Sequence, residues 1–171
     1  MNYTVSDMFS DHISKDWTIL TPSVDLSKRA ITAISVQDLP MEGILRPGEL
    51  VLVNIRERDP EDTIGRIVEE AGADNASGVL LALETDLPVS GEAIQKAEQL
   101  ELPLIRVPWE QRFADIQAAV NQAIWDTRTG PYQALQNSLF QDYFRGRSLE
   151  DALHSIAAVL TTEAEITDEY G

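Results

Sequence analysis

Four side chains that could bind a small molecule stand at the ends of segments that we predict to be β-strands. Asn54 and Arg56 end one apolar run, Glu84 follows a second, and Trp109 follows a third. Arginine offers a fork of donors for a carboxylate or an imide-like ring, asparagine offers a donor and an acceptor, and tryptophan can stack on a flat heterocycle. Ligands of open α/β sheets bind beyond the carboxyl ends of the strands. We therefore expect these four residues to form a ligand site.

Each candidate also has a purely structural interpretation. Arg56 could pair in solvent with Glu57 or Asp59, and Trp109 could fix the following helix to the sheet. Glu49 follows a Pro-Gly turn and could face a ligand, although we favour a role in the turn that delivers the next strand. Only an analogy with other α/β folds places the site, so both interpretations stay open.

The sequence holds no recognisable catalytic motif. Nucleophile elbows of the Gly-x-Ser-x-Gly type, Walker motifs and Gly-x-Gly-x-x-Gly loops are all missing, and there is no cysteine. His12 and His154 are far apart in the chain, and no acidic residues have the spacing of metal ligands. Acid pairs such as Glu61-Asp62 are explained by the helix dipole and by solvation. We expect no enzyme, no cofactor and no resident metal.

The composition argues against two further classes of function. The chain has 13 basic and 29 acidic residues and a formal net charge of −16. DNA-binding proteins need Lys and Arg to neutralise phosphates, so we expect no direct nucleic-acid contact by this chain. It has no run of eighteen apolar residues and no secretory signal, so we expect a cytoplasmic protein without a membrane span.

Alternating strands and helices would position the candidate residues. Helices are predicted to start at Asp59, at Ser90 and after Pro108, each after an apolar strand. This order predicts an α/β fold with a parallel-strand-rich sheet and flanking helices. Earlier β-rich runs over 17–21 and 30–36 complete the sheet or form a flap on it, and in the second run we expect Ile31, Ala33 and Val36 to face inward. The predicted strands of the alternating part cover 50–55, 78–83 and 104–107.

A helical connector is predicted after this domain. The long helix after Pro108 should be interrupted at Gly130-Pro131 and followed by further helices, so we divide the chain into a domain over 1–125 and, over 126–171, the connector and the start of a truncated next domain. The connector carries more large apolar residues than one sheet face needs, and these predict a dimer interface unless a missing domain covers them. The predicted interface residues are Trp125, Leu135, Leu139, Phe140 and Tyr143.

Five segments occur in an order and at a spacing that are specific, although none is specific alone. They are YTVSDMF at 3–9, ISVQDLP at 34–40, LRPGELVL at 45–52, GVLLAL at 78–83 and LPLIRVPW at 102–109. Over about residues 1–125 the chain resembles the N-terminal domain of the purine-catabolism regulator (PucR) family of bacterial transcription regulators. Relatives usually continue the strand after residue 53 into a turn rich in Thr and Gly. This chain continues into Asn54-Ile55-Arg56, so its ligand could differ or be absent.

The resemblance implies a non-catalytic module that senses a small-molecule effector, purine-related or another metabolite, for a helix-turn-helix domain outside this sequence. Since such regulators often read two-fold half-sites, we also expect a homodimer. One alternative is a ligand-free interaction module that only holds dimers together. A less favoured alternative is a small enzyme of nucleotide or sugar metabolism, which would need a cleft with convergent acids.

Overall fold

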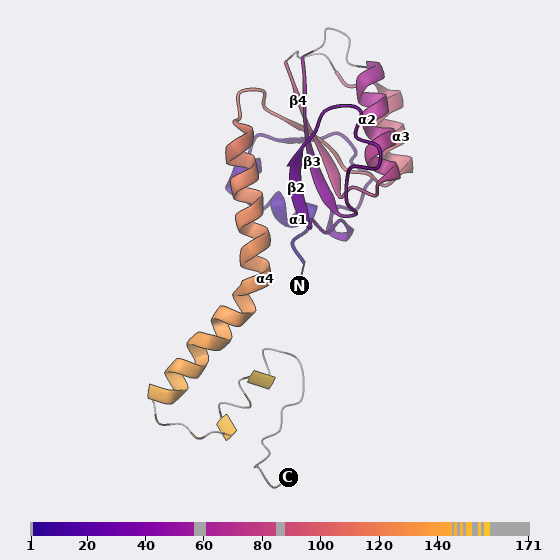
Figure 1. Ribbon diagram of the computed structural model, residues 1–171. Coiled ribbons are helices and arrows are strands. Elements are labelled where there is room, and N and C mark those ends of the chain that lie inside the picture. The colour runs from indigo at the N-terminus through magenta and orange to yellow at the C-terminus, as the bar shows by residue number, and fades with distance from the viewer. Residues whose placement is uncertain are drawn as a thin grey trace. The chain divides into compact units, whose positions relative to one another are not determined.

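Five strands form one sheet in the computed structural model, which describes residues 2–56, 61–84, 88–144, 146, 148, 150–151, 154 and 156–157 (Figure 1). The strand order is β1-β5-β4-β3-β2, in which β2 to β5 are parallel and β1 is antiparallel to β5. The sheet confirms the predicted α/β fold with mainly parallel strands. The strands are β1 (Thr18–Ile19), β2 (Ala33–Val36), β3 (Glu49–Ile55), β4 (Gly78–Leu83) and β5 (Leu104–Val107).

Helices cover both faces of the sheet, as right-handed crossovers between parallel strands require (Figure 1). Helices α2 and α3 pack on one face, and α1 with residues 113–124 of α4 packs on the other. The helices are α1 (Val5–Met8), α2 (Glu61–Ala73), α3 (Gly91–Gln99) and α4 (Phe113–Phe144), with short 3-10 helices η1 (His12–Ser14) and η2 (Leu26–Lys28).

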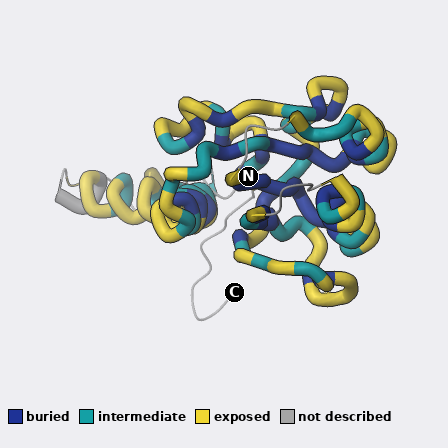
Figure 2. Tube along the Cα trace, turned by 90° about the horizontal axis from the view of Figure 1, so that it is seen from above, coloured by how far each residue is buried: buried dark blue, intermediate teal, exposed yellow. Residues whose placement is uncertain are grey.

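Buried residues concentrate along the strands, between the two helical layers (Figure 2). Every residue of β4 is buried, which explains its unbroken apolar sequence. Alternate residues face the two layers: Leu80 and Ala82 contact the α1–α4 side, whereas Val79 and Leu81 contact the α2–α3 side. The core therefore consists of two apolar clusters separated by the sheet.

The predicted inward face of the second strand was partly wrong. Ile31 is buried, but Ala33 is exposed and the side chain of Val36 is 42% exposed, while Ile34 is the buried residue of β2. Ile31 lies before the strand, where its backbone N–H donates to the carbonyl of Tyr3 at 2.7 Å. The alternation of side chains starts only at Ala33, so the predicted period was counted from the wrong residue.

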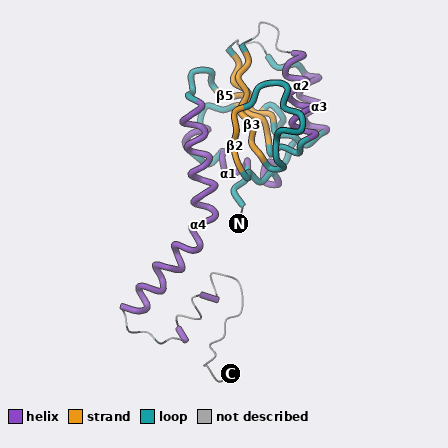
Figure 3. Tube along the Cα trace, in the orientation of Figure 1, coloured by secondary structure: helices purple, strands orange, loops and turns teal. Residues whose placement is uncertain are grey.

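Helix α4 continues through Gly130 and Pro131, so the predicted interruption was wrong (Figure 3). A proline inside a helix removes one backbone donor, and here the turns on both sides keep their helical form. The hydroxyl of Thr129 also donates to the carbonyl of Trp125 at 2.9 Å.

The chain divides into two compact units, residues 1–124 and residues 125–171, and α4 contributes to both. The second unit contains the rest of α4 and a capping box in which Ser148 and Asp151 exchange hydrogen bonds. In the described part of the chain, no helix is long and apolar enough to cross a membrane.

Two carboxylates, one in the last turn of α2 and one directly after this helix, hold the loop between β2 and β3 in place. Glu70 accepts the backbone N–H of Met41 at 2.6 Å and that of Glu42 at 3.2 Å, and Asp74 accepts that of Leu45 at 3.2 Å. The hydrogen bond from Met41 lowers the pKa of Glu70 although desolvation opposes it, and Arg66 adds to the lowering. Because these carboxylates satisfy the backbone N–H groups of Met41 and Leu45, the side chains of both residues can be buried in the core.

We expect Glu70→Gln to lower the free energy of unfolding at neutral pH by about 1–2 kcal/mol, because charge-assisted hydrogen bonds are the stronger ones. A lowered folded-state pKa stabilises the native state above the ordinary glutamate pKa of about 4.3, and this contribution disappears as pH falls through the folded value. The difference between the wild type and Glu70→Gln should therefore shrink below about pH 4.3 in urea titrations. Glu92→Gln, at an exposed position, is the control. A difference that stays constant down to pH 3 would contradict the assignment.

Candidate ligand-binding site

Four of the five predicted ligand residues lie at the carboxyl ends of the parallel strands. Asn54 in β3 is opposite Ala82 in β4, and Ala82 is opposite Val107 in β5. Ala82 and Val107 belong to the core cluster on the α1–α4 side of the sheet. Because side chains alternate, Asn54 occupies the same row on this side. The next positions on the same side, two residues further along each strand, lie at the carboxyl end of the sheet and are Arg56, Glu84 and Trp109.

Arg56 reaches Trp109 across the end of β4. Its guanidinium carbon lies 5.6 Å from the centre of the indole ring, a cation–π distance. Arg56 is exposed, and no carboxylate among the described residues pairs with it. Glu57 and Asp59, the partners of the alternative interpretation, lie outside the described residues. Trp109 also packs against the core cluster, so it supports α4 as well as facing the strand ends.

A hollow of about 310 Å³ opens beside Trp109. Its volume is close to the lower limit of pockets that hold small molecules. Sequence reasoning identified Glu84 and Trp109 but missed the wall formed by Asp16 and Thr18, which precede and begin β1. No signal in the sequence shows that β1 pairs with β5. The lining residues are Asp16, Thr18, Leu83, Glu84, Arg106, Val107, Pro108, Trp109 and Glu110.

Asn54 presents a buried acceptor at the same end of the sheet. Its side-chain oxygen has no hydrogen-bond partner among the described residues. A buried carbonyl oxygen of this kind normally accepts a hydrogen bond from protein, from an ordered water or from a ligand. Asn54 does not line the hollow itself, and lies one row deeper in the sheet than Arg56 and Glu84.

Glu49 lies at the opposite end of β3. Its carboxylate accepts the backbone N–H of Arg46 at 3.0 Å, and its own N–H donates to the carbonyl of Arg46 at 3.0 Å. Gly48 adopts a φ of +81° in this turn, a conformation that favours glycine. Glu49 therefore closes the turn before β3, and the structure does not bring it together with the other four residues.

Gln111 joins the two chain segments that form the walls of the hollow. Its side-chain oxygen accepts the indole N–H of Trp17 at 2.6 Å, and its amide donates to the carbonyl of Ile13 at 2.9 Å. Trp17 stands between the lining residues Asp16 and Thr18, and Gln111 directly follows the lining residue Glu110. These two hydrogen bonds therefore join the walls of the hollow, together with the pairing of β1 with β5.

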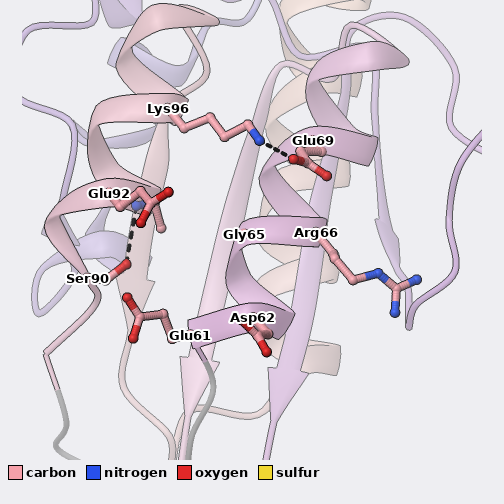
Figure 4. Close-up of a pocket in the computed structure, with 9 residues that line it drawn as sticks. Glu61, Asp62, Gly65, Arg66, Glu69, Ser90, Glu92 and Lys96 are labelled. Carbon is pink, nitrogen blue, oxygen red and sulfur yellow. Dashed lines mark hydrogen bonds and ion pairs between the residues drawn. The ribbon is translucent and has the colours of Figure 1, made fainter.

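A second hollow, of about 260 Å³, lies between α2 and α3 (Figure 4). Its cations pair with nearby acids, since Lys96 contacts Glu69 and Arg66 forms an ion pair with Glu70 at 3.3 Å. The hydroxyl of Ser90 caps α3 by accepting the N–H of Ala93 at 3.2 Å. Helix capping and surface ion pairs thus explain this hollow. In the described part of the chain, no three acidic or histidine residues are arranged to hold a metal ion.

The predicted dimer residues all lie on α4 in the second unit. Trp125 is 61% exposed and Phe140 is 55% exposed, whereas Leu135 and Leu139 are half-buried. Tyr132, which the interface prediction did not include, is 63% exposed. The side chain of Tyr143 lies outside the described residues.

The first unit is an α/β domain with a mainly parallel sheet and helices on both faces, and four of the five candidate residues lie at the carboxyl ends of its strands. Residues 10–124 match the model of the purine catabolism regulatory protein-like family, PucR. The match covers more than half of the chain, so the chain belongs to this family, and it contains a regulatory domain of a transcription regulator. Neither the curated proteins nor the solved structures gave a match.

Proposed function

We propose that residues 1–125 form a non-catalytic, cytoplasmic module that senses a small-molecule effector through Asn54, Arg56, Glu84 and Trp109. The observation that carries the proposal is the guanidinium of Arg56, which pairs with no carboxylate among the described residues and lies 5.6 Å from the ring centre of Trp109. Trp109 itself lines a hollow at the strand ends. An exposed arginine gains little for stability from such a position, whereas it is well placed to bind an anionic group.

Trp109 gives this site a route to α4. Only Glu110, Gln111 and Arg112 separate it from Phe113, the first residue of the helix. A ligand that contacts Trp109 would bind more tightly to one conformation of this segment than to others. Binding would therefore favour one placement of the first turn of α4. Residues 126–171 would then act as the connector that passes this preference to a DNA-binding domain.

A thermal-melt screen against purine degradation intermediates, nucleobases and small carboxylates tests the proposal. A ligand that binds only the native state raises the melting temperature in a concentration-dependent way. We expect Arg56→Ala to abolish this rise while changing the free energy of unfolding by less than about 0.5 kcal/mol, as is usual for surface substitutions. Arg66→Ala, exposed on α2, should keep the response. A large loss of stability in Arg56→Ala would instead make Arg56 structural and contradict the assignment.

We also propose that α4 carries the contact between two copies of the chain. Trp125, Tyr132 and Leu139 are spaced by seven residues, as in the contact line of a coiled coil, and the two aromatic side chains are more than half exposed. Exposed large aromatic residues are the type that dominates the energy of protein interfaces. A dimer without any ligand response would favour the interaction module over the sensor.

For the double variant Trp125→Ala with Tyr132→Ala, we expect the dimer dissociation constant to rise at least about tenfold, because truncating an interface hot spot costs about 2 kcal/mol or more and a tenfold change corresponds to about 1.4 kcal/mol. Analytical ultracentrifugation over a concentration series measures this constant. Ile44→Ala, which changes a 59% exposed residue of the first unit, is the matched control. A wild-type chain that stays monomeric at high concentration would rule the proposal out.

A further inference from the structure

The second half of α4 presents an exposed surface without charge. Residues 129–141 include no charged residue, although the whole chain has 29 acidic and 13 basic residues. Tyr132 and Phe140 are exposed in this stretch, and so are the uncharged polar residues Gln133 and Gln136. The solvent-facing side of a helix normally carries charged residues, whereas the core of a protein interface is poor in charge and rich in aromatic residues. The composition of this stretch is therefore that of a surface covered by a protein partner.

The charge of the chain favours a second copy of itself as this partner. Two chains with a formal net charge of −16 repel each other over most of their surfaces. They can approach at the lowest electrostatic cost where neither carries a charge, which is the case along residues 129–141. A basic partner would gain nothing from this stretch and would be attracted to the acidic remainder. This inference rests on the proposed dimer and specifies how its two helices are oriented.

The residues of the proposed contact line differ in size, and the difference favours one orientation. In a parallel pair of helices, Trp125, Tyr132 and Leu139 would each face the same residue of the second copy. Because contacting side chains set the distance between packed helices, such a pair would diverge from Leu139 towards Trp125. In an antiparallel pair centred on Tyr132, Trp125 faces Leu139 of the second copy at both ends. The layers then have similar volumes, and the two helices can pack closely along their length.

Arg128 favours the same orientation. It lies three residues after Trp125 and four before Tyr132, and hence on the same side of the helix. Arg128 is exposed and also interacts within its own chain. A parallel pair would bring two Arg128 side chains together, whereas an antiparallel pair brings Arg128 to Gln136, whose side-chain carbonyl can accept its N–H groups. We propose that the second halves of α4 from two copies pair in antiparallel orientation, with the two-fold axis at Tyr132.

Pulsed electron paramagnetic resonance on the whole chain measures the orientation. The chain has no cysteine, so a nitroxide label on one introduced cysteine marks one position in each copy. Gln133→Cys and Gln141→Cys are suitable because both residues are exposed and lie outside the contact line. In the antiparallel pair, the two labelled positions are separated along the helix axis by about 3 Å at residue 133 and about 27 Å at residue 141. We expect the label distance at 141 to be longer than that at 133 by at least about 10 Å, whereas a parallel pair would give similar distances.

Leu139→Trp tests the same proposal without a label. In the antiparallel pair, this variant places two tryptophans in each of the two outer layers, and such overpacking weakens association. We expect the dimer dissociation constant from analytical ultracentrifugation to rise at least about fivefold. In a parallel pair the variant would make the two ends equal in size and would not weaken the dimer. Asn137→Trp adds the same side chain at an exposed position outside the contact line, and this control should leave the constant unchanged.

The other outcomes separate the orientation from the dimer on which it rests. Similar label distances at 133 and 141, or an unweakened Leu139→Trp dimer, would overturn the antiparallel orientation and leave the contact through α4 standing. Label distances that persist in the double variant Trp125→Ala with Tyr132→Ala would place the contact elsewhere and overturn both. A wild-type chain that stays monomeric at high concentration would also overturn both.

Discussion

Leu80→Ala should lower the free energy of unfolding by about 2–5 kcal/mol, the usual range for truncating a buried leucine. Leu80 is fully buried in the central strand β4, between Leu52 of β3 and Ile105 of β5 in the register of the sheet. It also belongs to the core cluster beneath α1 and α4. The strands on both sides are fixed by their ladders, so the structure can collapse only partly into the space that the leucine leaves.

Urea denaturation measures this loss, and an unchanged dependence on urea concentration would show that the folded and unfolded states keep their compactness. Val36→Ala in the edge strand β2 is the matched control, because the side chain of Val36 is 42% exposed. We expect this control to cost less than about 1 kcal/mol. Equal losses in the two variants would mean that β4 is not the centre of the core.

The fold was predictable where burial governs the sequence directly. The unbroken apolar run of β4 has one explanation, a strand covered on both faces, and the structure buries all its residues. The sequence was less informative where a local signal, such as a proline, opposes the structure that the rest of the segment favours. Pro131 was predicted to interrupt a helix, yet α4 continues past it, because losing one backbone donor need not outweigh the other interactions of a long helix.

The candidate site was predictable to the extent that it depends on strand ends. The register of β3, β4 and β5 brings Arg56, Glu84 and Trp109 to one edge, as expected from parallel strands. The remaining wall, with Asp16 and Thr18, comes from a two-residue antiparallel strand that carries no periodic signal. Contacts between segments almost a hundred residues apart form only in the assembled fold, and no local pattern in a single sequence predicts them.

Gln111 is the clearest case of such a contact, and its replacement should have the second largest effect. Gln111→Leu keeps the side chain close in size but removes two hydrogen bonds. The indole N–H of Trp17 loses its acceptor at 2.6 Å, and the carbonyl of Ile13 loses its donor at 2.9 Å. Trp17 is only 8% exposed and packs edge-on against Phe9, so its N–H has little access to water. A buried polar group without a partner costs about 1–3 kcal/mol, and we expect a total loss of about 2–4 kcal/mol for the pair.

The loss should be accompanied by a local change that a general destabilisation would not produce. Exchange of the Trp17 indole proton, followed by NMR under native conditions, should become much faster in Gln111→Leu than in Gln95→Leu, which changes an exposed residue of α3. Because Gln111 joins the segment of Asp16 and Thr18 to that of Trp109 and Glu110, the same variant should also bind any effector of the hollow more weakly. Unchanged stability and unchanged indole exchange would show that water replaces Gln111, and the walls of the hollow would then be held by the β1–β5 pairing instead.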